Sequence, residues 1–136
     1  MLRLVLDTNI LISALLRKNT PPYQLYEAWR TGGFELVTSH EQLAEFQRVI
    51  AYEKLQRYFT PAEAQEMQAG IFAFAEFAYN LPVVSYSQDA DDNVILATAI
   101  AGAADYLVTG DKRDLLSLGR VERVSIVSVR QVLDIL

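Results

Sequence analysis

Short runs of consecutive apolar residues alternate with longer amphipathic segments along this chain of 136 residues. Runs that are apolar at every position, rather than at every second one, are typical of strands buried on both faces of a sheet. The pattern predicts five such strands, at Leu2–Asp7, Phe34–Thr38, Leu81–Ser85, Tyr106–Thr109 and Val124–Ser128.

Helices are predicted between these strands from apolar spacing, capping residues and breakers. Thr8-Asn9 would cap the first helix, and Thr60-Pro61-Ala62-Glu63 has the form of a capping box ahead of the longest. The predicted helices are Ile10–Leu16, Tyr23–Thr31, His40 to about Ala51, Pro61 to about Tyr79, a helix that Asp89–Asp92 caps and that runs through Ala101, and Val129–Leu136. Strands that alternate with helices indicate an α/β fold with a parallel sheet covered on both faces. The length fits a single domain over residues 1–136.

Composition narrows the chemistry. The absence of Cys excludes disulfides and thiolate zinc sites, and the single His40 leaves no site with several histidines. We expect His40 to belong to the start of its helix rather than to catalysis. Asp7 interrupts the first apolar run before a signal peptide could form, and no apolar stretch approaches the roughly 18 residues that span a bilayer. We therefore expect a cytoplasmic protein that does not contact a membrane.

The acidic residues are the candidates for chemistry. Asp7 ends the first strand, and Asp111 follows the fourth. Because ligand sites of open α/β sheets lie beyond the carboxyl ends of the strands, these two acids should share one rim. Glu45 and Asp92 lie on helices that begin shortly after strands, so they could lean over the same edge. Without these four carboxylates, the net charge of −5 would be −1, so the acidic balance weakens nucleic-acid binding without excluding it.

Four converging carboxylates would repel one another and raise their pKa values unless a cation joined them. Oxygen ligands alone favour Mg²⁺ or Mn²⁺ over zinc. Such ions lower the pKa of a bound water and stabilise charge on a phosphodiester, so no side-chain nucleophile is required. Thr8, Asn9 and Thr109 adjoin the acids and could orient ligands or waters.

Each acid also has a simpler explanation. Asp7 could only cap the following helix, Asp111 could be a turn residue after Gly110, and Glu45 could be a solvated residue. Asp89 and Asp91 compete with Asp92, which we favour because Ile95 and Ala99 mark the buried face nearest it.

Other charged and aromatic residues bear on ligands and partners. Asp114 could sit on the rim or cap Leu115-Leu116. Basic residues expected near the rim could hold RNA phosphates or be ordinary surface charge: Arg17, Lys18, Lys112 and Arg113. The aromatic surplus of the longest helix, including Phe72 and Phe77, exceeds what one buried face can hold and could form a surface for a partner.

Taken together, four segments resemble the motifs of the PIN-domain nucleases, and most closely the toxin-type branch that includes the VapC toxins. They are Leu4-Val5-Leu6-Asp7-Thr8-Asn9, Ser39 with Glu45 six positions later, Asp91-Asp92-Asn93 ahead of an Ile95–Ala101 helix, and Ala104-Asp105-Tyr106-Leu107-Val108-Thr109-Gly110-Asp111. The resemblance covers essentially the whole chain, with the motifs in the family's order. Lys112-Arg113 directly after Asp111, and the extra acids before the third motif, depart from many relatives.

The resemblance implies a three-layer α/β/α sandwich and a Mg²⁺- or Mn²⁺-dependent ribonuclease acting as the toxin of a toxin–antitoxin pair. It implies that Asp7, Glu45, Asp92 and Asp111 bind metal, with Asp114 accessory. It also implies an antitoxin partner that blocks the site, and a homodimer.

Two other functions fit parts of the pattern. A Mg²⁺-dependent phosphoryl-transfer domain, receiver-like or phosphatase-like, also places an Asp after a strand. The phosphatase pattern wants a second Asp where this chain has Asn9, and the receiver pattern wants an Asp where Ser85 follows the expected third strand. The other alternative is an inactive binding module, which the presence of all four acids disfavours.

Overall fold

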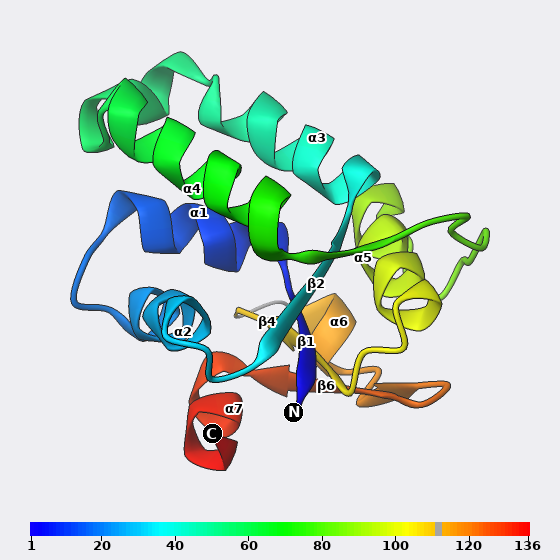
Figure 1. The fold of residues 1–136 in the computed structure, drawn as a ribbon. Helices are drawn as coiled ribbons and strands as arrows, with labels where there is room; N and C mark the ends of the chain where they lie inside the picture. Colours follow the sequence, from blue (N-terminus) through cyan, green and yellow to red (C-terminus); the bar gives the residue numbers. More distant parts are fainter. Residues whose placement is uncertain (111–112) are drawn as a thin grey trace.

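A computed structural model describes residues 1–110 and 113–136 of the chain, apart from the side chain of Arg113. Its helices are α1 (Thr8–Leu16), α2 (Pro21–Arg30), α3 (His40–Ile50), the 3₁₀ helix η1 (Glu53–Tyr58), α4 (Pro61–Phe74), α5 (Ala90–Ala101), α6 (Arg113–Leu116) and α7 (Val129–Ile135). Its strands are β1 (Arg3–Leu6), β2 (Glu35–Ser39), β3 (Glu76–Ala78), β4 (Tyr106–Thr109), β5 (Arg120–Val121) and β6 (Val124–Ser128). Figure 1 shows these elements arranged around one sheet.

The sheet runs in the order β3-β2-β1-β4-β6-β5. All neighbours are parallel except β5 and β6, which form an antiparallel pair. From β1 the chain builds outward to β2 and β3, and then returns to place β4 on the other side of β1. The strand order therefore reverses between β1 and β4, and the crevice beyond their carboxyl ends is where such sheets bind ligands.

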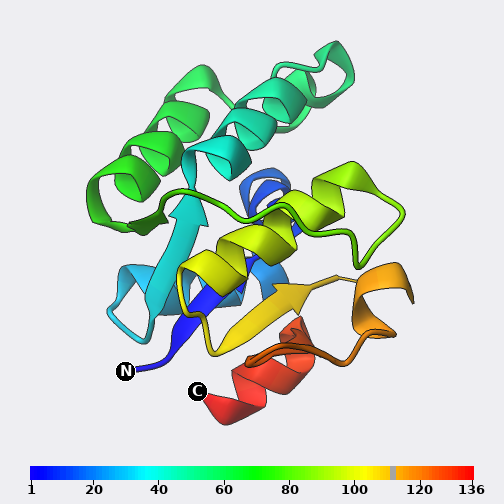
Figure 2. The same cartoon turned by 90° about the vertical axis from the view of Figure 1, so that its right-hand side faces the viewer.

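Alternate side chains of each central strand point to opposite faces of the sheet. Leu4 and Leu6 join a core under α1, α2, α3, α4 and α7, whereas Val5 joins a second core under α5 and α6. Figure 2 shows α5 lying across the strands on that second face. The result is the three-layer α/β/α sandwich that the resemblance implies, so the expected fold class is confirmed.

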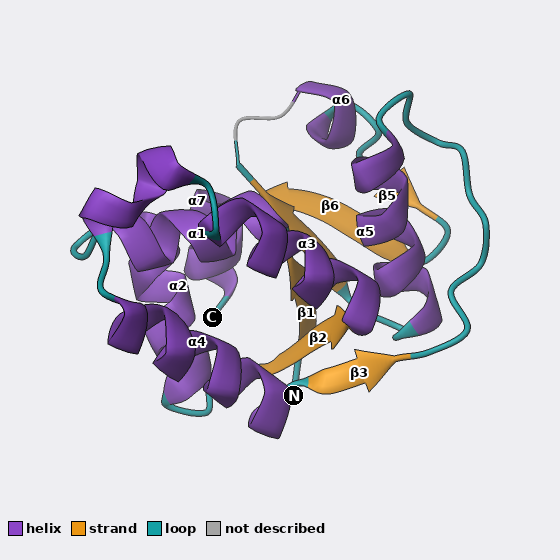
Figure 3. Cartoon of the chain, turned by 90° about the horizontal axis from the view of Figure 1, so that it is seen from above, coloured by secondary structure: helices purple, strands orange, loops and turns teal. Residues whose placement is uncertain are grey.

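The expected third strand is wrong. Residues 81–85 are irregular, and the side chain of Val83 is fully exposed. Pro82 has no backbone N–H to donate to a neighbouring strand. Asn80, two residues earlier, takes a left-handed backbone conformation (φ 57°). The long helix ends at Phe74 instead of about Tyr79, which frees Glu76–Ala78 to pair with β2. Figure 3 shows the resulting long loop from β3 to α5.

The sheet has six strands instead of the expected five. The sequence pattern also missed β5. This two-residue strand folds back on β6 through Glu122, which has a left-handed φ of 53°. Such a short hairpin has too few residues to show an apolar period. None of the described helices is long and apolar enough to cross a membrane.

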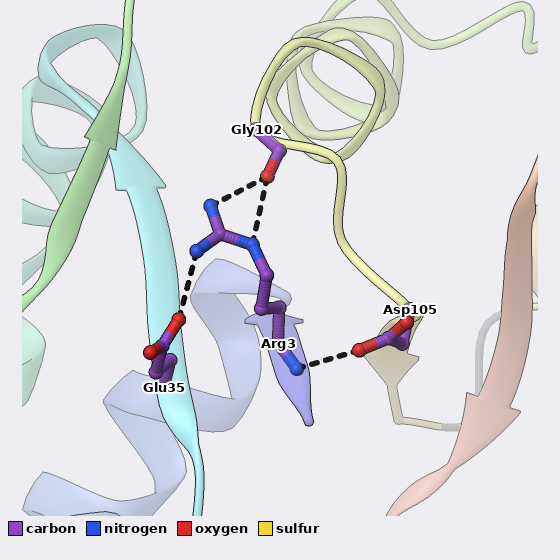
Figure 4. A network of polar contacts seen from close by, with 4 residues as sticks. All are labelled: Arg3, Glu35, Gly102 and Asp105. Carbon is purple, nitrogen blue, oxygen red and sulfur yellow. Dashed lines mark hydrogen bonds and ion pairs between the residues drawn. The ribbon is translucent and has the colours of Figure 1, made fainter. Parts of the chain in front are cut away.

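The amino end of β1 is tied down by a network of polar contacts (Figure 4). The Arg3 guanidinium donates to Glu35 at 2.8 Å and to the carbonyl oxygen of Gly102 at 2.7 and 3.2 Å. The Arg3 backbone N–H donates to Asp105 at 2.8 Å. This rim lies at the opposite end of the strands from Asp7, and its acidic residues Glu35 and Asp105 both have partners.

Candidate active site

Asp7 lies at the point where the strand order reverses. Its backbone N–H donates to the Val108 carbonyl at 2.8 Å, which extends the pairing of β1 with β4 by one residue. Its side chain is 2% exposed and accepts a hydrogen bond from the Thr109 hydroxyl at 2.8 Å. It also caps α1 by accepting from the Asn9 backbone N–H at 3.4 Å. Asp7, and not Thr8-Asn9, is therefore the cap of this helix, and it is a buried acid as well.

Glu45 reaches the same region from the middle of α3. Its half-buried carboxylate accepts a hydrogen bond from the Thr8 hydroxyl. Burial is the largest cause that raises the pKa of Glu45 above its ordinary value of 4.5. The negative charges of Asp91 and Asp7 raise the pKa further, while the Thr8 bond and Arg48 oppose the rise. The charge of Asp7 therefore acts on Glu45, although the two lie 38 positions apart in sequence.

The three acids at the start of α5 take three different positions. Asp89 is the cap and accepts from the Asp91 backbone N–H at 2.9 Å. Asp91 is exposed and pairs with Arg48 of α3, with 3.7 Å between Nη2 and Oδ2. Asp92 is 3% exposed, and the Ser87 hydroxyl donates to it at 3.5 Å. Asp92 is thus the buried member of the group, as the positions of Ile95 and Ala99 suggested.

Two of the expected metal ligands are not placed at the site. Asp111 lies outside the residues that the structure describes, as does the neighbouring Lys112. Asp114 is exposed in the first turn of α6. Among residues 1–110 and 113–136, no three His, Asp or Glu side chains are grouped so that they could hold a metal ion. The described acids alone therefore do not form a complete metal-binding set.

Of the basic residues expected near the rim, Arg17 and Lys18 have described side chains, and both lie elsewhere. Arg17 caps the carboxyl end of α1, ten residues and about 15 Å along the helix axis from Asp7. Lys18 pairs with Glu63 at 3.6 Å. The described cation near the acids is Arg48, one helical turn beyond Glu45, which the sequence analysis missed. Its i+3 spacing from Glu45 on one helix is the signal that could have found it.

A buried polar network beneath the acids was also missed. Gln42, which is 1% exposed, donates to the Leu6 carbonyl at 2.6 Å and accepts from the Thr38 hydroxyl at 2.8 Å. The hydroxyls of Ser39 and Thr98 share a 2.8 Å hydrogen bond that joins β2 to α5. Ser39 also caps α3, as expected. Thr8, Asn9 and Thr109, which the sequence marked for orienting ligands, all contact an acid in this region.

His40 opens α3, as expected, and contacts aromatic side chains. Its exposed ring stands 4.6 Å from the Phe77 ring and 5.7 Å from the Tyr79 ring, between centroids. Phe72 also contacts this group and is 65% exposed. The side chain of Phe74 is 80% exposed. The aromatic surplus of α4 therefore does reach the surface, around the sheet edge formed by β3.

Comparisons with known proteins agree with this fold. Residues 3–113 match the family model described as the PIN domain. A search of curated proteins finds no match. Among solved structures, the chain is similar to one in the crystal structure of VapBC2 from Rickettsia felis bound to a DNA fragment from their promoter. That match has 18% sequence identity and a TM-score of 0.59, and it covers 93% of this chain and 98% of the other.

At this identity the structural match shows the fold alone, whereas the family model covers most of the chain and includes Asp7, Glu45 and Asp92. PIN domains are generally nucleases, so the family favours a nuclease over the phosphoryl-transfer alternative. The chain belongs to the PIN-domain family.

Proposed function

We propose that this protein is a divalent-metal-dependent ribonuclease and the toxin of a toxin–antitoxin pair. The observation that carries the proposal is the pair of buried carboxylates, Asp7 and Asp92, with Glu45 close enough for Asp7 to raise its pKa. Buried acids that repel one another are costly to the fold and are common at functional sites. Membership in the PIN-domain family supports the same chemistry.

The donor set fits Mg²⁺ or Mn²⁺. Asp7, Glu45 and Asp92 offer carboxylate oxygens, which hard cations prefer, and the mutual repulsion at Glu45 is what a cation would relieve. We assign metal binding to these three residues together with Asp111, which lies outside the described residues, and assign Asp114 an accessory role. When bound, such a metal lowers the pKa of water and stabilises the charge that develops on a phosphodiester.

The chain's own residues orient the acids. The Thr109 hydroxyl donates to one oxygen of Asp7, and the Asn9 backbone N–H contacts the other, so the carboxylate is held from both sides. The Thr8 hydroxyl holds Glu45 in the same way from α1. We assign Arg48 a contact with a phosphate of the RNA, because its ion pair with Asp91 is exposed and such pairs are weak enough to exchange.

We further propose an antitoxin partner and a homodimer. The similar solved structure is that of VapBC2 with promoter DNA, which supports a partner of that kind. The exposed aromatic side chains of Phe72 and Phe74 supply apolar surface that a partner could cover.

The activity is tested by incubating the purified protein with RNA in Mn²⁺ or Mg²⁺ and following cleavage on a gel. We expect cleavage that EDTA abolishes and that excess Mn²⁺ restores. Cleavage that persists in EDTA, in a preparation free of other ribonucleases, would contradict the metal-dependent mechanism. The toxin role is tested by co-expression with the product of the gene directly upstream, which should suppress the cleavage.

A further inference from the structure

Gln42 joins three elements beneath the acids. It lies in the first turn of α3, yet its side-chain amide extends to β1 and β2. The nitrogen donates to the Leu6 carbonyl at 2.6 Å, and the oxygen accepts from the Thr38 hydroxyl at 2.8 Å. The nitrogen also makes a longer contact, at 3.5 Å, with the Thr8 hydroxyl oxygen. A polar side chain only 1% exposed thus connects the strand that ends at Asp7 with the helix that carries Glu45.

The directions of these hydrogen bonds are fixed by chemistry. The Leu6 carbonyl can only accept, so the amide nitrogen must face it and the amide oxygen must face Thr38. An ionised Glu45 can only accept, so the Thr8 hydroxyl donates to it and offers its lone pair to Gln42. The donors therefore run in one direction, from Thr38 through Gln42 and Thr8 to Glu45.

The local sequence predicts a different use for Gln42. Ser39 and Gln42 have the spacing of a capping box, in which the Gln side chain returns to the backbone of the cap residue. The Ser39 hydroxyl does accept from the Gln42 backbone N–H at 3.1 Å, but the Gln42 side chain turns toward Leu6 instead. A helix cap alone therefore does not account for a buried amide at this position.

We propose that Gln42 is a positioning residue, which acts through Thr8 to hold Glu45 where it can bind metal together with Asp7. The inference rests on the proposed metal-binding function. Hydrogen bonds in a chain polarise and orient one another, so loss of the Gln42 amide leaves the Thr8 hydroxyl free to rotate away from Glu45. Residues that orient metal ligands typically contribute about 10–100-fold to metal affinity.

The test is a double-mutant cycle on Mn²⁺ affinity, measured by calorimetry without RNA. Gln42→Met keeps the side-chain length and removes the hydrogen bonds, and Thr8→Val removes the hydroxyl. We expect each single variant to lower the Mn²⁺ affinity by about 10-fold. If Gln42 acts through Thr8, the double variant should lose little more than Thr8→Val alone.

A matched control is Gln56→Met. The Gln56 amide also donates to a backbone carbonyl at 2.6 Å, that of Ile50, but it lies on η1, away from the acids. Its substitution should leave the Mn²⁺ affinity unchanged. If Gln42→Met fails to fold, Thr38→Val replaces it, because this change removes the donor to the Gln42 oxygen while keeping the side-chain shape.

Three outcomes would overturn the inference. One is an unchanged Mn²⁺ affinity in Gln42→Met with a lowered unfolding temperature, which would show a purely structural role. Another is an effect of Gln42→Met that is equally large with and without Thr8. The last is an absence of Mn²⁺ binding by the wild-type protein, which would also remove the proposed function, whereas the first two would leave that function standing.

Discussion

Glu45 is a half-buried acid whose pKa is raised in the folded protein, and this shift has a measurable effect on stability. Burial, followed by the charges of Asp91 and Asp7, raises its pKa above 4.5 in the folded protein. The folded state therefore binds a proton more tightly than the unfolded state does. Between pH 4.5 and the folded pKa, stability falls as the pH rises, because folding must then take up a proton, which becomes less favourable at higher pH.

We predict that Glu45→Gln unfolds at a higher temperature than the wild-type protein at pH 7, in metal-free buffer. The amide keeps an acceptor for Thr8 but carries no charge. The difference should shrink toward zero as the pH falls below about 4.5, where the wild-type carboxyl becomes protonated in both states. Thermal unfolding across this pH range measures it. A difference that stays constant with pH would argue against a raised pKa of Glu45.

Arg48 supplies a second prediction for a single residue. Its guanidinium lies 3.7 Å from Asp91, and both side chains are more than half exposed. An exposed pair of this kind contributes about 0–1 kcal/mol, so Arg48 can exchange Asp91 for an RNA phosphate at little cost.

We predict that Arg48→Gln weakens RNA binding and lowers the slope of log affinity against log salt by about one. Asp91→Asn should strengthen binding, because it frees Arg48. Fluorescence anisotropy in EDTA measures both without cleavage. The control is Arg123→Gln, an exposed position next to Asp105 at the opposite rim of the sheet. Equal losses for Arg48→Gln and Arg123→Gln would show only a general effect of charge.

At the scale of elements, the packing of α5 against β2 depends on Gly102. A methyl group built there would overlap the Cγ1 atom of Val37 and lie 3.1 Å from the Thr98 carbonyl oxygen. Gly70 of α4 offers the opposite case, since a methyl group there meets nothing within 4 Å.

We predict that Gly102→Ala lowers the free energy of unfolding by about 1–3 kcal/mol, the usual cost of overpacking. Gly70→Ala should raise it by roughly 0.5–1 kcal/mol through helix propensity alone. Urea unfolding of the two variants measures both. The same sign for both changes would mean that the helix–sheet contact at Gly102 is not close packed.

The elements that the sequence predicted correctly are those with strong local signals. The buried runs of β1, β2, β4 and β6 are apolar at successive positions, and the cap residues Ser39 and Thr60 mark helix starts. The third strand was misplaced because Leu81–Ser85 is apolar but contains Pro82, whereas Glu76–Ala78 pairs with β2 without a strong pattern. Strand pairing is a long-range contact, which local composition does not encode.

The residues of the candidate site were also predicted where the local sequence marks them and missed where their contacts are long-range. Asp7 and Asp92 were found because each stands at the end of a buried apolar pattern, and burial agrees for both. Gln42 and Arg48 were missed because their partners, Leu6 and Asp91, lie on other elements. Only the folded arrangement shows which polar side chains meet.

At the scale of the whole molecule, the described acids Asp7, Glu45 and Asp91 lie close enough for their negative charges to interact. Four of the assigned carboxylates account for most of the net charge of −5, and the strand order reverses between the two strands that Asp7 and Asp111 follow. A cation that binds the folded chain, but not the unfolded one, would stabilise it by mass action.

We predict that Mn²⁺ raises the unfolding temperature of the wild-type protein, with a gain of about 2.7 kcal/mol at 100 times its dissociation constant. Asp92→Asn should lose most of this gain, because the buried carboxylate no longer contributes a charged ligand. Differential scanning fluorimetry measures it, with KCl at matched ionic strength as the control. An equal shift in KCl would indicate screening and not a metal site.

The most direct test of the central claim is RNA cleavage in Mn²⁺ by Asp7→Asn compared with Asp105→Asn. Asn caps a helix about as well as Asp, so Asp7→Asn removes the carboxylate while keeping α1 capped. Asp105 lies at the opposite rim, where it accepts from the Arg3 backbone, and serves as the matched control. We predict that Asp7→Asn cleaves more than about 100-fold more slowly than the wild-type protein, whereas Asp105→Asn cleaves at the wild-type rate. Wild-type cleavage by a folded Asp7→Asn variant would contradict the assignment of the active site.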